Sequence, residues 1–124
     1  MTIWENGRMS VEGSGAEVRR PQAGAVDQLP VELKPTTHEF LKALTSPTRQ
    51  RIMLLFARGA ELSVGEVAEH VGIGQSTASE QLAVLRRAGI VTSRRTGKIV
   101  LYRSDRDGAL EVLADLQAYL RTCC

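Results

Sequence analysis

Hydrophobic residues recur three or four positions apart in five stretches of the chain, and this spacing predicts five amphipathic helices. The positions are Phe40, Leu41 and Leu44; Ile52, Leu55 and Phe56; Val64, Val67, Ala68 and Val71; Ala78, Leu82 and Leu85; and Leu110, Leu113, Leu116 and Leu120. The last set, with Ala114 and Ala118, forms a broader apolar face than one small core needs.

Capping residues indicate where several of these helices begin and end. Ser46 followed by Pro47 is typical of a helix start, and Gly59 follows the expected end of that helix. Ser63 and Glu66 have the spacing of a capping box at the start of the next helix, which Gly72 closes. The last helix has Asp105 or Ser104 as its cap.

After Gly89 the apolar period changes from helical to alternating. Residues 90–104, IVTSRRTGKIVLYRS, predict two strands joined by a turn at Thr96 and Gly97. The expected domain, residues 35–124, is therefore mostly α with a small β-hairpin, in the order α-α-α-α-β-β-α. Residues 1–34 have no sustained period and predict a disordered tail; a docked extra helix anchored by Trp4 is the alternative.

The helix within residues 74–91, GQSTASEQLAVLRRAGIV, carries short polar side chains at its start and two arginines at its end. Two short helices joined by a glycine-containing turn are typical of a helix-turn-helix, whose second helix reads base edges with its N-terminal residues. The expected base-reading residues are Gln75, Ser76, Thr77, Ser79, Glu80 and Gln81. Gln81 has the chemistry to pair with adenine, and Glu80 to accept from cytosine.

Basic residues surround this helix and continue into the hairpin. Residues 75–103 hold six arginines and lysines and one glutamate. We expect Arg86 and Arg87, and Arg94, Arg95 and Lys98 on the hairpin wing, to contact phosphates of double-stranded DNA. The alternatives are a solvated polar surface and a protein-binding module, which often lacks a basic wing. No glycine-rich phosphate loop or paired catalytic motif favours an enzyme.

Three segments resemble the ArsR/SmtB (arsenic-repressor) family of winged helix-turn-helix regulators. They are LKALTSPTRQRIMLLF (41–56), SVGEVAEHVGIGQSTASEQLAVLRRAGIV (63–91) and RRTGKIVLYRS (94–104). The resemblance implies a transcriptional repressor that forms a homodimer through its first and last helices, binds an inverted-repeat operator, and leaves it when an effector binds.

The sequence departs from this family at its sensor positions. Where many members have a cysteine pair, this chain has Ser63 and Gly65, and where others have metal ligands on the last helix, the matching residues are Arg106, Asp107, Tyr119 and Thr122. Gln81 replaces the usual recognition-helix histidine. Both family metal sites are therefore expected to be absent.

Cys123 and Cys124 are the only cysteines and end the chain. Adjacent Cα atoms are about 3.8 Å apart, too close for a relaxed mutual disulfide. Both thiolates suit a soft effector such as arsenite, cadmium or zinc, and Asp105 or Asp107 of a second chain is a candidate further ligand. Oxidation at these thiols, or no role, is the alternative; no cofactor is required.

The start of the chain does not resemble a signal peptide, and the sequence has no long apolar run. We therefore expect a cytoplasmic protein with no membrane partner.

Overall fold

The computed structural model describes residues 2–5, 8–11, 24 and 32–124. The chain divides into two compact units, Met1–Pro30 and Val31–Cys124. In the first unit, strands β1 (Thr2–Glu5) and β2 (Arg8–Val11) pair antiparallel. Trp4 lies in β1 and not in a helix. Most of the residues for which a disordered tail was predicted, 1–34, lie outside the described residues.

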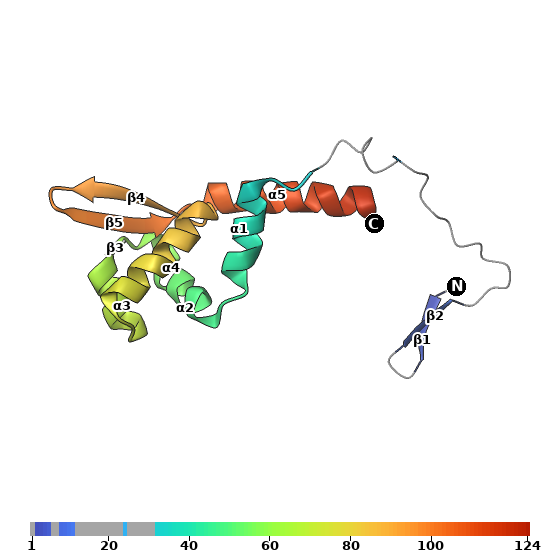
Figure 1. Cartoon of the computed structure of the whole chain (residues 1–124), viewed down its shortest axis with the longest axis horizontal. Coiled ribbons are helices and arrows are strands. Elements are labelled where there is room, and N and C mark those ends of the chain that lie inside the picture. Colours follow the sequence, from blue (N-terminus) through green and yellow to red (C-terminus); the bar gives the residue numbers. More distant parts are fainter. Residues whose placement is uncertain (1, 6–7, 12–23, 25–31) are drawn as a thin grey trace. The chain divides into compact units, whose positions relative to one another are not determined.

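Five α-helices make up most of the second unit (Figure 1). They are α1 (Pro35–Leu44), α2 (Pro47–Leu55), α3 (Val64–Val71), α4 (Gln75–Arg87) and α5 (Arg106–Cys123). The order predicted from the apolar spacing is confirmed. Among its described residues, this unit also contains a 3₁₀ turn, η2 (Ala57–Gly59), and a short strand between η2 and α3, neither of which the sequence predicted.

The predicted caps form at three helix starts. Ser46 Oγ accepts from the backbone N–H of Arg49 at 3.3 Å at the start of α2. At α3, Ser63 and Glu66 form the reciprocal capping box, with bonds of 3.2 Å and 3.0 Å. At α5 the cap is Asp105, whose carboxylate accepts from Gly108 N–H at 3.0 Å. These bonds satisfy N–H groups that a helix start leaves unpaired.

Helix α2 is shorter than predicted, because it ends at Leu55 and not next to Gly59. Arg58 adopts a left-handed conformation with φ 62°, which α-helix cannot include. The chain therefore turns away through η2. The buried face is nevertheless as expected, since Ile52 and Phe56 are almost completely buried.

The hairpin belongs to a three-stranded antiparallel sheet with the order β3-β5-β4. Its strands are β3 (Leu62–Ser63), β4 (Val91–Thr96) and β5 (Ile99–Ser104). Thr96 pairs with Ile99, so the turn residues are Gly97 and Lys98, one position later than predicted. Gly97 has φ 61°, which a two-residue hairpin turn requires at this place.

The core lies where α1, α2, α3 and α4 meet the base of the sheet. It contains Phe40, Ala43, Ile52, Phe56, Val67, Ala78, Leu82, Leu85, Ile90, Val91 and Val112. Helix α5 adds Val112, but Leu110, Leu113 and Leu120 on the same helix are each 49% exposed. Figure 1 shows that α5 runs past α1 and leaves its C-terminal half without a neighbour from this unit.

Candidate nucleic-acid interface

Helix α4 follows α3 after a turn of Gly72, Ile73 and Gly74. Gly72 has φ 78° and closes α3, while the half-buried Ile73 packs against the core. Gly74 precedes α4, and no side chain caps it. The first N–H groups of α4 are therefore available to an anionic ligand, which the positive end of the helix dipole also favours.

The start of α4 has the two faces that its sequence predicts. Gln75, Ser76, Thr77, Ser79 and Glu80 are exposed. On the opposite face Ala78, Leu82 and Leu85 are completely buried. Five of the six expected base-reading side chains thus lie on the molecular surface, on a helix held by the core.

Gln81 is the exception, because it is half-buried and bonded within the protein. Its Oε1 accepts from Arg49 Nη1 at 2.9 Å. Arg49, on α2, was not singled out in the sequence, where it resembles any exposed arginine of a first helical turn. Nothing local in the sequence pairs it with a residue on another helix.

The two arginines at the end of α4 are exposed, as expected for phosphate contacts. They border an open hollow of about 450 Å³ together with Ser79, Ala83 and Tyr102. Arg87 Nε lies 3.9 Å from Glu39 Oε2 on α1, a long contact between partly exposed groups. Arg86 therefore has the more available charge of the two.

On the wing, Arg94 is engaged with Glu61, which precedes β3. Arg94 Nε and Nη2 donate to the two carboxylate oxygens at 2.6 Å and 3.1 Å, and Nη1 donates to Thr96 Oγ1 at 2.8 Å. This pairing lowers the pKa of Glu61 and raises that of Arg94. Arg95 and Lys98 are exposed. The sequence does not predict this role for Glu61, because it is an isolated acidic residue that belongs to no helical or strand pattern.

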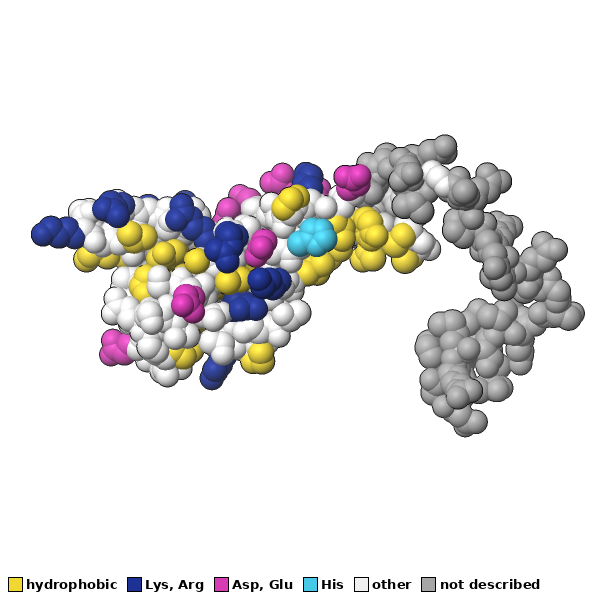
Figure 2. All heavy atoms as spheres, in the orientation of Figure 1, with side chains coloured by type: hydrophobic (Ala, Val, Ile, Leu, Met, Phe, Trp, Pro, Cys, Tyr) yellow, Lys and Arg dark blue, Asp and Glu magenta, His cyan; other side chains and the backbone are white. Residues whose placement is uncertain are grey.

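Figure 2 shows Lys and Arg side chains over the hairpin and beside α4, and hydrophobic side chains gathered along α5 on the same face. On this face, Lys and Arg side chains are most frequent over the hairpin and α4, and hydrophobic side chains dominate along α5. Two surfaces of different chemistry follow from this arrangement.

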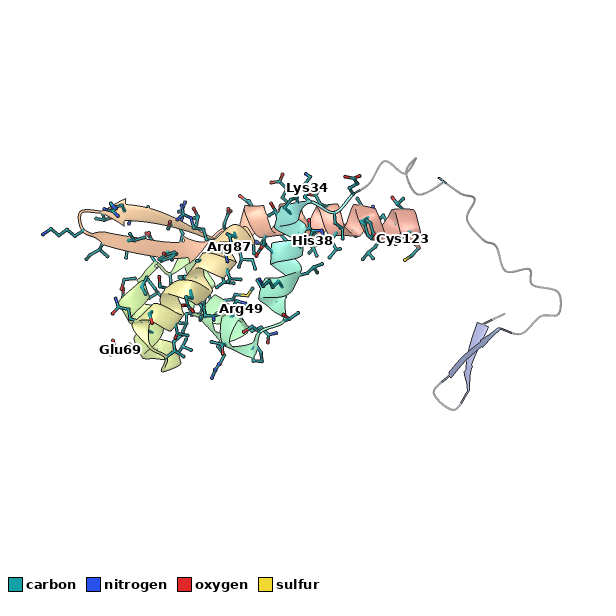
Figure 3. All side chains as sticks on the ribbon, in the orientation of Figure 1. Lys34, His38, Arg49, Glu69, Arg87 and Cys123 are labelled. Atoms are coloured by element: carbon teal, nitrogen blue, oxygen red, sulfur yellow. The ribbon has the colours of Figure 1, made fainter. Side chains whose placement is uncertain are left out.

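The two cysteines lie at the far end of α5 (Figure 3). Both are exposed, and their Sγ atoms are 3.1 Å apart. This hydrogen bond raises the pKa of Cys123. Asp105 and Asp107 lie at the other end of α5, about 27 Å away at 1.5 Å per residue. Within one chain the four expected ligands are therefore not together, and Asp105 already serves as the cap.

No group of three or more His, Cys, Asp or Glu side chains that could hold a metal occurs among the described residues. A hollow of about 540 Å³ between η2 and the start of α5 has mainly apolar walls, including Met53, Phe56 and Ile90. None of the helices that the structure describes combines the length and apolarity needed to cross a membrane.

Residues 46–93 match the family model described as "Bacterial regulatory protein, arsR family". A biofilm growth-associated repressor from Xylella fastidiosa is 48% identical over 63 residues, which are 51% of this chain and 54% of the relative. The HTH-type transcriptional regulator NmtR from Mycobacterium tuberculosis is 37% identical over 91 residues, 73% of this chain and 72% of the relative. The chain thus spans about half the length of the first relative.

Among solved structures, a winged helix-turn-helix DNA-binding domain from Mycobacterium bovis is similar, with a TM-score of 0.55 and 30% identity. The match covers 69% of this chain and 79% of that domain. That domain is described as homodimeric and as a possible ArsR-family regulator. The proteins reported above are named as regulators or repressors, and the region that matches the family model includes the turn and α4.

Proposed function

Because this chain belongs to the arsR family of bacterial regulatory proteins, we propose that it is a sequence-specific DNA-binding transcriptional repressor. The observation that carries this proposal is the start of α4, where exposed polar side chains stand on a helix whose opposite face is fully buried. Such a helix presents a slim, rigid end with hydrogen-bonding groups, as the major groove requires.

Base reading falls to Gln75, Ser76, Thr77, Ser79 and Glu80, with the uncapped N–H groups of α4 available to a nearby phosphate. Gln75 carries an amide that can pair with adenine, and Thr77 offers a hydroxyl and a methyl group to base edges. Glu80 is repelled by phosphates, so it reads a base that donates or points away from the DNA. Gln81 contributes through its amide nitrogen at most, since its oxygen is bonded to Arg49.

Phosphate contacts fall to Arg86 and Arg87 at the end of α4, and to Arg95 and Lys98 on the wing. All four side chains are exposed. Arg94 contributes less, because Glu61 neutralises it. The four cations come from the end of α4 and from the wing, so phosphate contacts by them would hold the register of α4 on the duplex without carrying sequence information.

We also propose that two chains pair through α1 and α5. The supporting surface consists of leucines that one chain leaves 36% to 49% exposed: Leu41, Leu44, Leu110, Leu113 and Leu120. Leu113, Leu116, Gln117 and Leu120 form a shallow groove of about 250 Å³. A contiguous apolar surface of this kind is typical of an interface. A two-fold dimer presents two α4 helices and matches an inverted repeat.

Salt-dependent binding to duplex DNA tests the DNA-binding function. We expect the logarithm of the association constant for a mixed-sequence duplex to fall linearly with the logarithm of the salt concentration, because bound phosphates release counterions. A protein-binding module gives no such slope. Binding that is absent at low salt, or that is insensitive to salt, would contradict the proposal.

For the effector, we propose the exposed pair of Cys123 and Cys124 as the site where a thiophilic ion such as arsenite, cadmium or zinc binds, with Asp107 of a second chain as a further ligand. Two soft sulfur donors 3.1 Å apart support this. Titrating each ion into the protein–DNA complex should release DNA. If the Cys123→Ser/Cys124→Ser variant releases DNA equally, or if no ion releases DNA from either protein, the proposed ion site is contradicted. The redox alternative is tested by adding an oxidant in place of the ion.

A further inference from the structure

We propose that Arg49 is a positioning residue that sets the orientation of α4 relative to α1, and thereby the spacing at which a dimer reads its two half-sites. This inference rests on the proposed function. It adds a residue whose hydrogen bonds are all within the protein and connect the element proposed to read the duplex to an element proposed to form the dimer.

The guanidinium of Arg49 bonds to two other helices at once (Figure 3). Nε donates to the carbonyl of Ala43 at 3.1 Å and Nη2 to the carbonyl of Lys42 at 2.8 Å, both in the last turn of α1. Nη1 donates to Gln81 Oε1 on α4 at 2.9 Å. All three nitrogens are thus used, and one side chain on α2 joins α1 to α4.

The last carbonyls of α1 are natural partners for a cation. A helix end leaves its final carbonyls without intrahelical donors and carries partial negative charge. Gln50, the next residue on α2, makes a similar contact, since its Nε2 donates to the Leu44 carbonyl at 2.7 Å. Gln50 therefore connects α2 only to α1, whereas Arg49 connects α2 to both α1 and α4.

The hydrogen bond to Gln81 fixes the rotation of α4 in a way that apolar core contacts do not. Ala78, Leu82 and Leu85 hold α4 by apolar contacts, which are strong but not directional. Gln81 lies on the border between this buried face and the exposed face. A charge-assisted hydrogen bond at that border restricts rotation of α4 about its axis, and this rotation determines where Gln75 and Thr77 point.

The other end of the connection lies beside the proposed dimer surface. Leu41 and Leu44, which are partly exposed on α1, flank the two carbonyls that Arg49 holds. A shift of α1 in the dimer is therefore passed to α4 through three hydrogen bonds. Since the separation of the two recognition helices fixes the half-site spacing, Arg49 should determine how strictly that spacing is selected.

The test uses Arg49→Met, which keeps the aliphatic length and removes the donors, with Gln50→Met as the matched control. A consensus duplex is first selected with the natural protein. Affinity is then measured for that duplex, for versions with the half-sites moved one base pair closer or further apart, and for unrelated DNA. Dimer mass and thermal unfolding are recorded for each variant.

We expect Arg49→Met to lose about tenfold of the preference for the selected spacing, the loss that one charge-assisted hydrogen bond accounts for. Its salt slope and its affinity for unrelated DNA should not change, because the guanidinium faces protein and not phosphate. Gln50→Met should keep the preference. If Arg49→Met fails to fold, Arg49→Lys replaces it. A single ammonium group can still donate to the α1 carbonyls, but it does not also reach Gln81 on the other helix.

An unchanged spacing preference in the folded Arg49 variant, or an equal loss in Gln50→Met, overturns the inference. A salt slope that falls by about one unit also overturns it, because Arg49 would then be a phosphate contact. Failure of the natural protein to bind any duplex is a different result, which contradicts the proposed function itself.

Discussion

Arg94 and Arg95 are neighbours on β4, yet their side chains have different surroundings. Arg94 donates to both carboxylate oxygens of Glu61 and to Thr96, while Arg95 is exposed. The sequence predicts both as phosphate contacts, because charge and position on the hairpin are the same. Glu61 is 33 residues away from Arg94, and only the folded sheet brings them together.

Replacing these two arginines separately should therefore give different losses of DNA affinity. Arg95→Ala removes an available charge, so affinity should fall for every duplex and the salt slope by about one unit. Arg94→Ala removes a charge that is already neutralised, so the slope should change by much less. Fluorescence anisotropy at several salt concentrations measures both. Equal slopes for the two variants would show that the pairing with Glu61 does not persist on DNA.

Glu66 makes the stability of the protein depend on pH. Its hydrogen bonds with Ser63 lower its pKa below the ordinary value of 4.5. A carboxyl whose pKa is lower in the folded state adds stability above its unfolded pKa, and that stability disappears as the pH falls through the folded value. The melting temperature of Glu66→Gln, which keeps the cap, should fall less between about pH 6 and pH 3 than that of the natural protein.

Glu69→Gln is the matched control, since Glu69 is an exposed carboxylate on the same helix. It should leave the acid dependence of the melting temperature as in the natural protein. If Glu66→Gln and the natural protein lose the same stability on acidification, the bonds of the capping box do not lower the pKa of Glu66.

At the scale of helices and strands, local signals predicted most of the fold. Capping bonds join residues three apart, as at Ser63 and Glu66, so the sequence contains both partners. The predicted end of α2 was wrong because Gly59 is typical of a glycine that closes a helix, whereas α2 already ends at Leu55 and the left-handed Arg58 precedes that glycine. Strand β3 was missed because two residues have no period, and it exists only through its pairing with β5.

The same local reasoning predicts opposite effects on stability for two glycine replacements, one within α3 and one at the residue that ends it. Gly72 has φ 78° at the helix end, where an alanine is strained, so Gly72→Ala should reduce the free energy of unfolding by about 1 kcal/mol. Gly65 lies within the helix, and an added Cβ meets Ser63 Oγ at 4.0 Å. Gly65→Ala should therefore increase it by about 0.5–1 kcal/mol. Urea unfolding measures both, and changes of the same sign would contradict the conformational argument.

At the scale of the whole molecule, the sequence predicted both surfaces but not how their residues are connected. The exposed face of α4 and the broad apolar face of α5 follow from periodicity, since each side chain's face depends on its own helix. Gln81 and Arg94 were predicted as free for DNA, yet each is bonded to a residue from a distant part of the chain. Contacts between elements carry no local pattern, so Arg49 and Glu61 emerged only from the structure.

The proposed dimer makes a direct prediction for the leucines of α5. Leu113 is 49% exposed in one chain, and Leu113→Glu should place a charge in the interface and give monomers, because an unpaired charge is costly to bury. Light scattering should then report one chain of 13.5 kDa. Leu54→Glu is the control: Leu54 is 75% exposed on α2, and its replacement should leave the dimer intact. A dimeric Leu113→Glu protein would contradict the α5 interface.

Selection from a random duplex library tests most directly whether the start of α4 reads sequence. The natural protein should enrich an inverted repeat. Thr77→Ala should enrich a repeat with one degenerate position, the same in both half-sites, while Arg95→Ala should enrich the natural repeat with lower affinity. If no common sequence is enriched, or if Thr77→Ala selects the same repeat as the natural protein, then α4 does not read DNA in the way its exposed side chains indicate.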